Sequence, residues 1–321
     1  MSDYDASQVG NEKGDAAFTR KSPYGSSYEP TYSGATSFLR CQYTRDLHDV
    51  DVAISGIPFD LATTGRPGAR LGPRAVRQAS TNLAWDWPQG WDFNPLDRLK
   101  VVDWGDCTFD PGTPATWIER MEAHAADILA SDTAMLTLGG DHFVTYPLLK
   151  AHAAKHGTLS LIHFDAHSDT WEDAPGRIDH GTMFFHAKEQ GLISAERSVQ
   201  VGIRTHNPKS HGFNIINGRD ACAQSAEEIG ASIKKVVGNN PAYLTFDIDC
   251  IDPAYAPGTG TPCIGGLTTR HTLDILRSLE GINLVGMDVV EVAPAYDVSE
   301  ITALAAASIA YQMLALYASK A

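Results

Sequence analysis

Residues 161–169 read Leu161-Ile162-His163-Phe164-Asp165-Ala166-His167-Ser168-Asp169, an apolar run that ends in potential metal ligands at alternate positions. Successive side chains of a β-strand point to opposite faces of the sheet. An extended backbone past Phe164 would therefore project Asp165, His167 and Asp169 from one side. The stretch predicts a buried strand followed by an aligned row of ligands.

Two further apolar runs end in the same way. Residues 243–246 precede Asp247 and Asp249, and residues 136–138 lead through Gly139-Gly140 to Asp141 and His142. In open parallel sheets, ligands bind beyond the carboxyl ends of the strands. We therefore expect three strand ends to converge on one site.

The order of elements predicts an α/β fold with three layers, in which a mostly parallel sheet carries helices on both faces. The expected strands have nearly continuous apolar runs, as a sheet that is covered on both faces requires. They cover residues 50–57, 99–104, 134–138, 158–165, 198–203, 242–246 and 283–290. One helix is expected to begin at Pro73. The other expected helices cover residues 116–130, 143–155, 182–190, 225–237, 269–279 and 300–318.

The chain has 321 residues, of which 43% are hydrophobic, enough for one large core. We expect a single catalytic domain over residues 46–321. Residues 1–45 are rich in Ser, Gly and Tyr without a sustained period, which predicts an N-terminal arm that is loosely ordered or forms an interface.

The formal net charge of −14 argues against nucleic acid as a partner, because phosphates bind to basic surfaces. It suits a small cationic substrate, although an acidic surface also serves solubility alone. The five cysteines are scattered and form no CxxC pair, which is typical of reduced cytoplasmic thiols. The sequence shows neither a signal peptide nor a run of about eighteen apolar residues, so we expect a cytoplasmic protein without membrane contact.

Four carboxylates in one pocket, from Asp165, Asp169, Asp247 and Asp249, would repel each other strongly. Two unit charges about 4 Å apart cost about 4 kcal/mol at an effective dielectric of about 20. Two divalent cations would balance the four negative charges, which favours two metals over one. Carboxylates with the imidazoles of His142 and His167 form an oxygen-rich set suited to Mn²⁺, so two Mn²⁺ per subunit are predicted.

A single Asp at a strand end is more often a turn or helix cap than a ligand, but three such strand ends are hard to explain by capping. His163 and Asp141 lie next to the predicted ligands. We expect His163 to be a hydrogen-bonded histidine deeper in the sheet. Asp141 is predicted to support the turn.

Three segments together resemble the ureohydrolase (arginase/agmatinase) family. They are Gly139-Gly140-Asp141-His142, Phe164-Asp165-Ala166-His167-Ser168-Asp169 and the long stretch 245–262, which includes Asp247-Ile248-Asp249 and Pro257-Gly258-Thr259-Gly260-Thr261-Pro262. The resemblance implies an arginase-like fold, a binuclear manganese centre with an activated hydroxide, and hydrolysis of a guanidinium group to urea and an amine. It also implies a homotrimer or homohexamer.

The resemblance also implies residue roles. One metal would take His142, Asp165, Asp169 and Asp247, and the other His167, Asp165, Asp247 and Asp249. His180 matches the active-site histidine of the family, a proton shuttle, and Glu291 matches the glutamate that pairs with the guanidinium. Either Asp249 or His180 would bring the proton to the leaving amine.

The loops over the site are expected to choose the substrate. Residues 170–179 lack the Asn, Ser and Thr pattern with which arginases hold an amino-acid head group, and residues 204–208 lack their Asp. Agmatine, which would yield putrescine and urea, suits the carboxylates of Glu172, Asp173 and Asp179. Arg177 keeps 4-guanidinobutyrate, the substrate of a guanidinobutyrase, open as an alternative, although a loop arginine is more often a solvated or bracing charge. Arg66 and Arg70 are expected to hold their loop to carboxylates.

Two other functional classes fit the sequence less well. A non-catalytic ureohydrolase-like subunit would have a broken ligand set, whereas all six ligands, His180 and Glu291 are present. A binuclear metallophosphatase would line its pocket with cations for phosphate, whereas Glu291 indicates a cationic substrate.

Overall fold

The computed structural model describes residues 32–110 and 112–320. A nine-stranded sheet forms its centre, with the strand order β1-β3-β2-β4-β9-β8-β5-β6-β7 and parallel pairing between all neighbours. The strands are β1 Gln42–Tyr43, β2 Val52–Gly56, β3 Val101–Asp106, β4 Ala134–Leu138, β5 Ser160–Phe164, β6 Val199–Ile203, β7 Asn214–Asn217, β8 Ala242–Asp247 and β9 Leu284–Val290.

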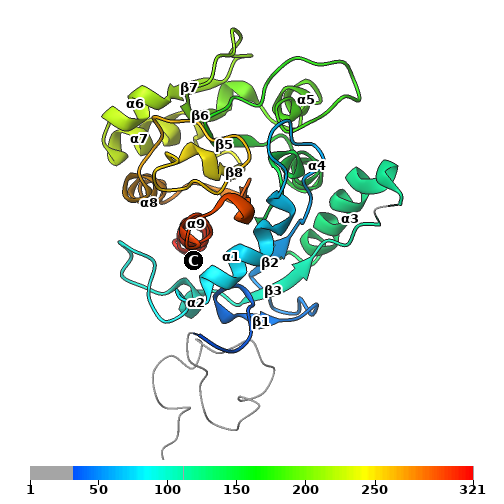
Figure 1. Ribbon diagram of the computed structural model, residues 1–321, viewed down its shortest axis with the longest axis vertical. Coiled ribbons are helices and arrows are strands. Elements are labelled where there is room, and N and C mark those ends of the chain that lie inside the picture. The colour runs from blue at the N-terminus through cyan, green and yellow to red at the C-terminus, as the bar shows by residue number, and fades with distance from the viewer. Residues whose placement is uncertain (1–31, 111, 321) are drawn as a thin grey trace, which may run out of the picture.

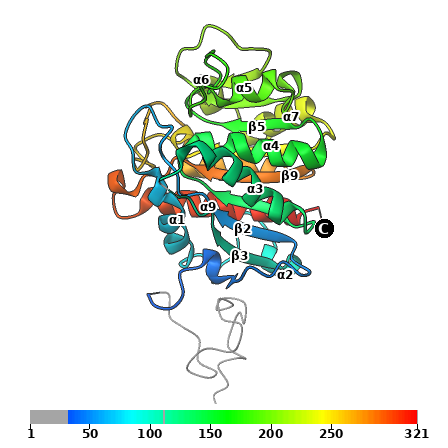
Figure 2. The same ribbon diagram turned by 90° about the vertical axis from the view of Figure 1, so that its right-hand side faces the viewer.

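Helices cover both faces of this sheet, which confirms the predicted three-layer fold. In Figure 1, α3, α4 and α5 lie on one side of the strands, and α1, α2, α7, α8 and α9 lie on the other; Figure 2 brings the first group to the front. The helices are α1 Gly72–Ser80, α2 Pro95–Arg98, α3 Trp117–Leu129, α4 Thr145–His156, α5 Met183–Glu189, α6 Gly218–Ala223, α7 Ala226–Val237, α8 Thr269–Ser278 and α9 Ile301–Ala318.

Local sequence explains several of these boundaries. Pro73 occupies the first turn of α1, where its missing N–H costs no hydrogen bond. Ser225 and Glu228 form a capping box at the start of α7. The seven predicted strands are present. The sequence did not predict β1, β7, α2 or α6, which are short; β1 and β7 lie at the two edges of the sheet and carry no long apolar run.

The central strands are buried along their whole length. Every residue of β2, β4, β5, β6 and β8 is buried, in agreement with their continuous apolar sequences. The register aligns the strand ends, because Leu138 pairs with Val289 on β9, Asp247 with Val290, and Phe164 with Phe246. The residues that follow these strands therefore emerge at the same level of the sheet.

The last helix, α9, is an apolar element of the interior. Among the described residues it is the one helix long and apolar enough, by length and composition, to cross a membrane, and 78% of it is buried. It contacts α1, α8 and β9. A helix buried in a protein core has the same composition, so this feature is explained by packing.

The predicted N-terminal arm over residues 1–45 lies mostly outside the described residues. Within the described part, Phe38 and Leu39 are fully buried. The backbone N–H of Phe38 donates to Asp103 Oδ2 at 2.8 Å, and Arg77 binds the same carboxylate. This network joins the segment before β1 to β3, the neighbour of the edge strand β1.

Candidate metal centre and substrate site

The ligand-bearing segment after β5 is not an extended strand. β5 ends at Phe164, and Asp169 has a backbone φ of 51°, in the left-handed region. The prediction of a straight row of Asp165, His167 and Asp169 is therefore wrong. The loop turns instead, with the N–H of His167 donating to Asp165 Oδ1 at 2.6 Å, and it still brings the three side chains to one place.

His142 is the centre of a first group of candidate ligands. Its Nδ1 lies 3.0 Å from Asp165 Oδ2, 3.0 Å from Asp169 Oδ2 and 3.3 Å from Asp247 Oδ2. All four side chains are buried. Strands β4, β5 and β8 and the loop after β5 thus supply the set that the sequence predicted for one metal.

A second group surrounds His167. Its Nδ1 lies 3.2 Å from Asp165 Oδ1 and 3.1 Å from Asp249 Oδ2. The backbone N–H of Asp249 donates to Asp247 Oδ1 at 2.8 Å. Asp165 therefore faces His142 with one carboxylate oxygen and His167 with the other, which is the geometry of a bridging ligand.

The ring of His142 is oriented for a cation. Its Nε2 lies 2.8 Å from Thr245 Oγ1, and Thr245 in turn donates to Asp288 Oδ1 at 2.5 Å. The Nδ1 atom is buried and has no hydrogen-bond partner in the described part of the chain, although three carboxylate oxygens lie nearby. Burial opposes a charge on this ring, but the nearby carboxylates of Asp165, Asp169 and Asp247 outweigh it and raise the pKa of His142 above its ordinary value. A bound divalent cation would take the place of the proton on Nδ1, and the contacts with Thr245 and Asp288 would fix the ring tautomer.

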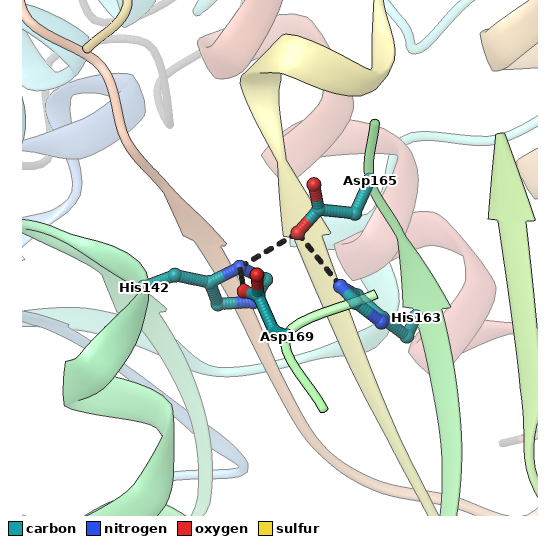
Figure 3. Close-up of side chains that lie close together, drawn as sticks. All are labelled: His142, His163, Asp165 and Asp169. Carbon is teal, nitrogen blue, oxygen red and sulfur yellow. Dashed lines mark hydrogen bonds and ion pairs between the residues drawn. The ribbon is translucent and has the colours of Figure 1, made fainter. Parts of the chain in front are cut away.

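His163 behaves as the sequence predicted. Figure 3 shows His142 and His163 both pointing toward Asp165. The Nε2 of His163 lies 2.8 Å from Asp165 Oδ2, and its Nδ1 lies 3.0 Å from Gln200 Nε2. Since both ring nitrogens have hydrogen-bond partners, His163 positions Asp165. The neighbouring Asp141 accepts from the N–H of Ala62 at 2.9 Å, which supports the loop after β2.

Electrostatics also favour bound cations. Burial, and then the charge of Asp165, raises the pKa of Asp169 to about 7. Burial and the charge of Asp249 raise the pKa of Asp247, and burial with the charge of Asp165 raises that of Asp249. These carboxylates are costly to ionise together without a compensating positive charge.

Glu291 and His180 lie beside the first group. Glu291 follows β9 with a φ of 64°, and its Oε1 accepts from the N–H of His142 at 2.8 Å and lies 2.9 Å from His180 Nδ1. Non-glycine residues rarely adopt this backbone conformation unless the surrounding structure imposes it. The glycine pair makes the approach possible: Gly140 O accepts from the N–H of Glu291 at 2.8 Å, and a side chain on Gly140 would collide with the Phe59 carbonyl.

Thr64 is a contact of His180 that the sequence did not reveal. Its N–H donates to His180 Nε2 at 2.8 Å, and its hydroxyl lies 2.7 Å from the same nitrogen. When the His180 ring is neutral, its Nε2 can accept a hydrogen bond from the Thr64 N–H. When the ring is charged, Nε2 can donate to the Thr64 hydroxyl, so this nitrogen has a partner in both protonation states. The two residues are 116 positions apart, and no local sequence signal joins them.

Several charged side chains of the loops over the site form ion pairs with one another. Glu172 lies 2.7 Å from Lys209, and Arg177, whose side chain is 77% exposed, lies 3.7 Å from Asp173. Arg70 pairs with Asp60, as predicted for that loop. The expectation for Arg66 is wrong, because its guanidinium lies over the ring of Tyr296, 5.2 Å from the centroid.

Asn207 joins two of these loops. Its Nδ2 donates to Ser168 Oγ at 2.9 Å and to Thr170 Oγ1 at 3.2 Å. These two hydroxyls flank Asp169, so the loop after β6 supports the loop that carries three candidate ligands. The sequence indicated only that residues 204–208 differ from arginases.

Comparisons with known proteins agree with this site. Residues 50–315 match the family described as the arginase family. An agmatinase from Chromobacterium violaceum is 55% identical over 309 residues, which cover 96% of each protein. A crystal structure described as a hypothetical agmatinase from Burkholderia thailandensis is 57% identical with a TM-score of 0.92, over 96% of this chain and 98% of that one. The proclavaminate amidino hydrolase of Streptomyces clavuligerus is 37% identical with a TM-score of 0.85, over 91% and 100%.

Proposed function

The chain belongs to the arginase family, and we propose that it is a metal-dependent hydrolase that converts the guanidinium group of agmatine to urea, releasing putrescine. This proposal rests on the position of Asp165. One of its carboxylate oxygens faces His142 and the other faces His167, and the buried carboxylate of Glu291 lies beside them. The relatives named agmatinase, 50–55% identical over most of the chain, support the choice of substrate.

We assign the metal ligands as the family resemblance implies: His142, Asp165, Asp169 and Asp247 for one ion and His167, Asp165, Asp247 and Asp249 for the other. Six side chains, four of them carboxylates, suit two Mn²⁺ ions better than zinc, which prefers sets rich in sulfur and nitrogen. Two such ions supply Lewis acidity and an activated water at this place.

Side chains of the protein bind the substrate and transfer the protons. Glu291 binds the planar guanidinium by charge-assisted hydrogen bonds and holds its carbon in place for attack by water. Both protons of the water end on the leaving nitrogen, which departs as an ammonium group. Asp249 takes a proton inside the site, and His180, with Thr64 on its outer nitrogen, exchanges a proton with solvent.

The substrate choice rests on the relatives and on the loop charges. Because Arg177 is exposed and near Asp173, it is a weak candidate for binding the carboxylate of a guanidino acid. Glu172 is paired with Lys209, so it is less available to the ammonium of agmatine than the sequence suggested. Asp179 lies in the same loop. Within the described residues, its carboxylate has one hydrogen bond, which it accepts from the backbone N–H of Gly181.

We further propose a cytoplasmic location and a homotrimeric or homohexameric assembly, with residues 46–321 as one catalytic domain and residues 1–45 as an arm that is loosely ordered or forms an interface. The family membership and the sequence support these proposals.

The test is urea release by Mn²⁺-loaded protein offered agmatine, 4-guanidinobutyrate and arginine separately, each with a chelated control. Metal-dependent urea mainly from agmatine is expected. A preference for 4-guanidinobutyrate would overturn the substrate assignment but keep the chemistry. No urea from any of the three would overturn the proposed activity.

A further inference from the structure

Three oxygen atoms lie around the space that a side chain on Gly260 would take up. A side-chain carbon built on Gly260 would lie 2.9 Å from the Arg66 carbonyl oxygen, 3.4 Å from Glu291 Oε2 and 3.8 Å from Thr63 Oγ1. These are the three heavy atoms nearest to that point outside the neighbouring residues. The space is therefore lined by hydrogen-bond acceptors, which favours a group rich in N–H donors.

Two of these oxygens are unused. Glu291 Oε2 and Thr63 Oγ1 are both buried, and neither has a hydrogen-bond partner within residues 32–110 and 112–320. Glu291 Oε1 has two partners, the N–H of His142 and His180 Nδ1. A buried polar atom without a partner costs about 1–3 kcal/mol, so such atoms in a native site need a reason.

No cation of the chain fills this place among the contacts described. The side chain of Arg66, whose carbonyl lines the space, turns to the ring of Tyr296. The loop is nevertheless held close, because the N–H of Arg66 donates to Gly260 O at 3.3 Å, and a side chain on Gly65 would meet Gly260 O at 3.0 Å. The loop after β2 and the loop after β8 therefore lie against each other beside Glu291.

We propose that Thr63 is a substrate-binding residue, whose hydroxyl accepts a hydrogen bond from the same guanidinium that Glu291 Oε2 binds, and that Gly260 lacks a side chain so that this group can fit. The inference rests on the proposed function, since it assigns a contact to the guanidinium end of the substrate. It also predicts that Thr63 is indifferent to the far end of the molecule.

Three variants test the proposal. Thr63→Val removes the hydroxyl at nearly constant volume, Thr63→Ser keeps it, and Gly260→Ala fills the space. Thr137→Val is a matched control, because Thr137 Oγ1 in β4 is also buried and lacks a hydrogen-bond partner in the described structure. Manganese content and thermal midpoint identify any variant that is merely misfolded.

The probe is propylguanidine, which shares the guanidinium group and the adjoining alkyl carbons with agmatine but lacks its ammonium end. Its inhibition constant against agmatine hydrolysis is measured, together with its direct binding to the Mn²⁺-loaded protein by calorimetry. Loss of one hydrogen bond to a charged group should weaken propylguanidine binding by about 10- to 100-fold in Thr63→Val. The KM for agmatine should rise by a similar factor with little change in kcat, because the contact exists before reaction.

Thr63→Ser and Thr137→Val should stay within about 2-fold of the wild type, and Gly260→Ala should lose more than Thr63→Val. Unchanged propylguanidine binding in Thr63→Val would overturn the proposal, and so would an equal loss in Thr63→Ser, which would assign the effect to packing of the methyl group. If the wild type released no urea from agmatine, the proposed function would fail, while the calorimetric comparison would still decide the role of Thr63.

Discussion

His180 Nδ1 lies 2.9 Å from Glu291 Oε1, so the candidate proton-shuttle histidine and the candidate guanidinium-binding carboxylate form one buried pair. The pair leaves Glu291 Oε2 for the substrate and His180 Nε2 for Thr64. In the proposed mechanism, the binding of substrate and the transfer of protons would therefore be coupled through a single carboxylate.

The first prediction concerns this coupling. Burial opposes the charge on His180, but the hydrogen bond and charge of Glu291 outweigh it and raise the pKa of His180 to about 9. In Glu291→Gln that charge is lost, so the pKa of His180 should fall toward or below its ordinary value near 6.5. Titration of the His180 ring by NMR in the chelated protein measures this shift. The same pKa in both proteins would show that Glu291 does not control His180.

Sequence patterns predicted the parts of this structure that depend on long buried runs. Strands β2 to β6, β8 and β9 were found because continuous apolar sequences mark covered parallel strands, and all the predicted ligands end or follow such strands. The edge strands β1 and β7 and the helices α2 and α6 were missed because they are short. The contact of Thr64 with His180 was missed because it depends on how two distant loops pack.

The conformation of the loop that carries Asp165, His167 and Asp169 also could not be predicted from the sequence. Asp169 adopts a φ of 51°, which glycine takes readily and aspartate only occasionally, and nothing in the residue pattern indicates it. Similarly, the loop carboxylate of Glu172 was identified as a candidate for the ammonium of agmatine, but its pairing with Lys209 became visible only in three dimensions.

The second prediction concerns Asp169, whose raised pKa of about 7 is due first to burial and then to Asp165. A carboxyl group with a raised pKa favours folding at low pH and loses this advantage as the pH rises from its unfolded value near 3.9 through about 7. Without metal at pH 8, Asp169→Asn should therefore be more stable than the wild type, by roughly 4 kcal/mol at most. With Mn²⁺ the order should reverse, because a ligand is lost.

Urea-induced unfolding at pH 8 with chelator and with Mn²⁺ measures both effects. Asparagine tolerates the left-handed backbone of position 169. Asp49→Asn is the control, because Asp49 has a φ of 54° but is exposed, and it should change neither value. A chelated Asp169→Asn protein less stable than the chelated wild type would contradict the account of carboxylate repulsion.

The third prediction is a loss of stability in acid that does not involve the metal centre. Burial lowers the pKa of His152 and of His124 to about 4. The unfolded value is near 6.5, so the stability from keeping each ring neutral is fully present above pH 6.5 and is lost as the pH falls toward 4. The difference corresponds to roughly 3 kcal/mol for each histidine.

The difference in free energy of unfolding between His152→Gln and the wild type, both chelated, tests this expectation between pH 7.5 and 4.5, because the titration of Asp169 is common to both proteins. Relative to the wild type, His152→Gln should become more stable as the pH falls, whereas His48→Gln, at a side chain that is 80% exposed, should not. An identical slope in His152→Gln and the wild type would show that His152 does not titrate in this range.

The fourth prediction concerns Arg177. Because its side chain is exposed and its ion pair with Asp173 spans 3.7 Å, the contribution of Arg177 to binding should be small. Arg177→Ala should keep kcat/KM for agmatine within about 2-fold and leave the ratio of agmatine to 4-guanidinobutyrate unchanged. Parallel urea assays provide this ratio. A change of more than about 10-fold would make Arg177 a selector of the substrate.

The most direct test of the central claim is anomalous diffraction at the manganese edge from crystals grown with Mn²⁺. Two ions are predicted for each chain, one on each side of Asp165, with His142 Nδ1 on the first and His167 Nδ1 on the second. Manganese peaks at both positions would establish the binuclear centre. A single peak, or peaks away from Asp165, would contradict it.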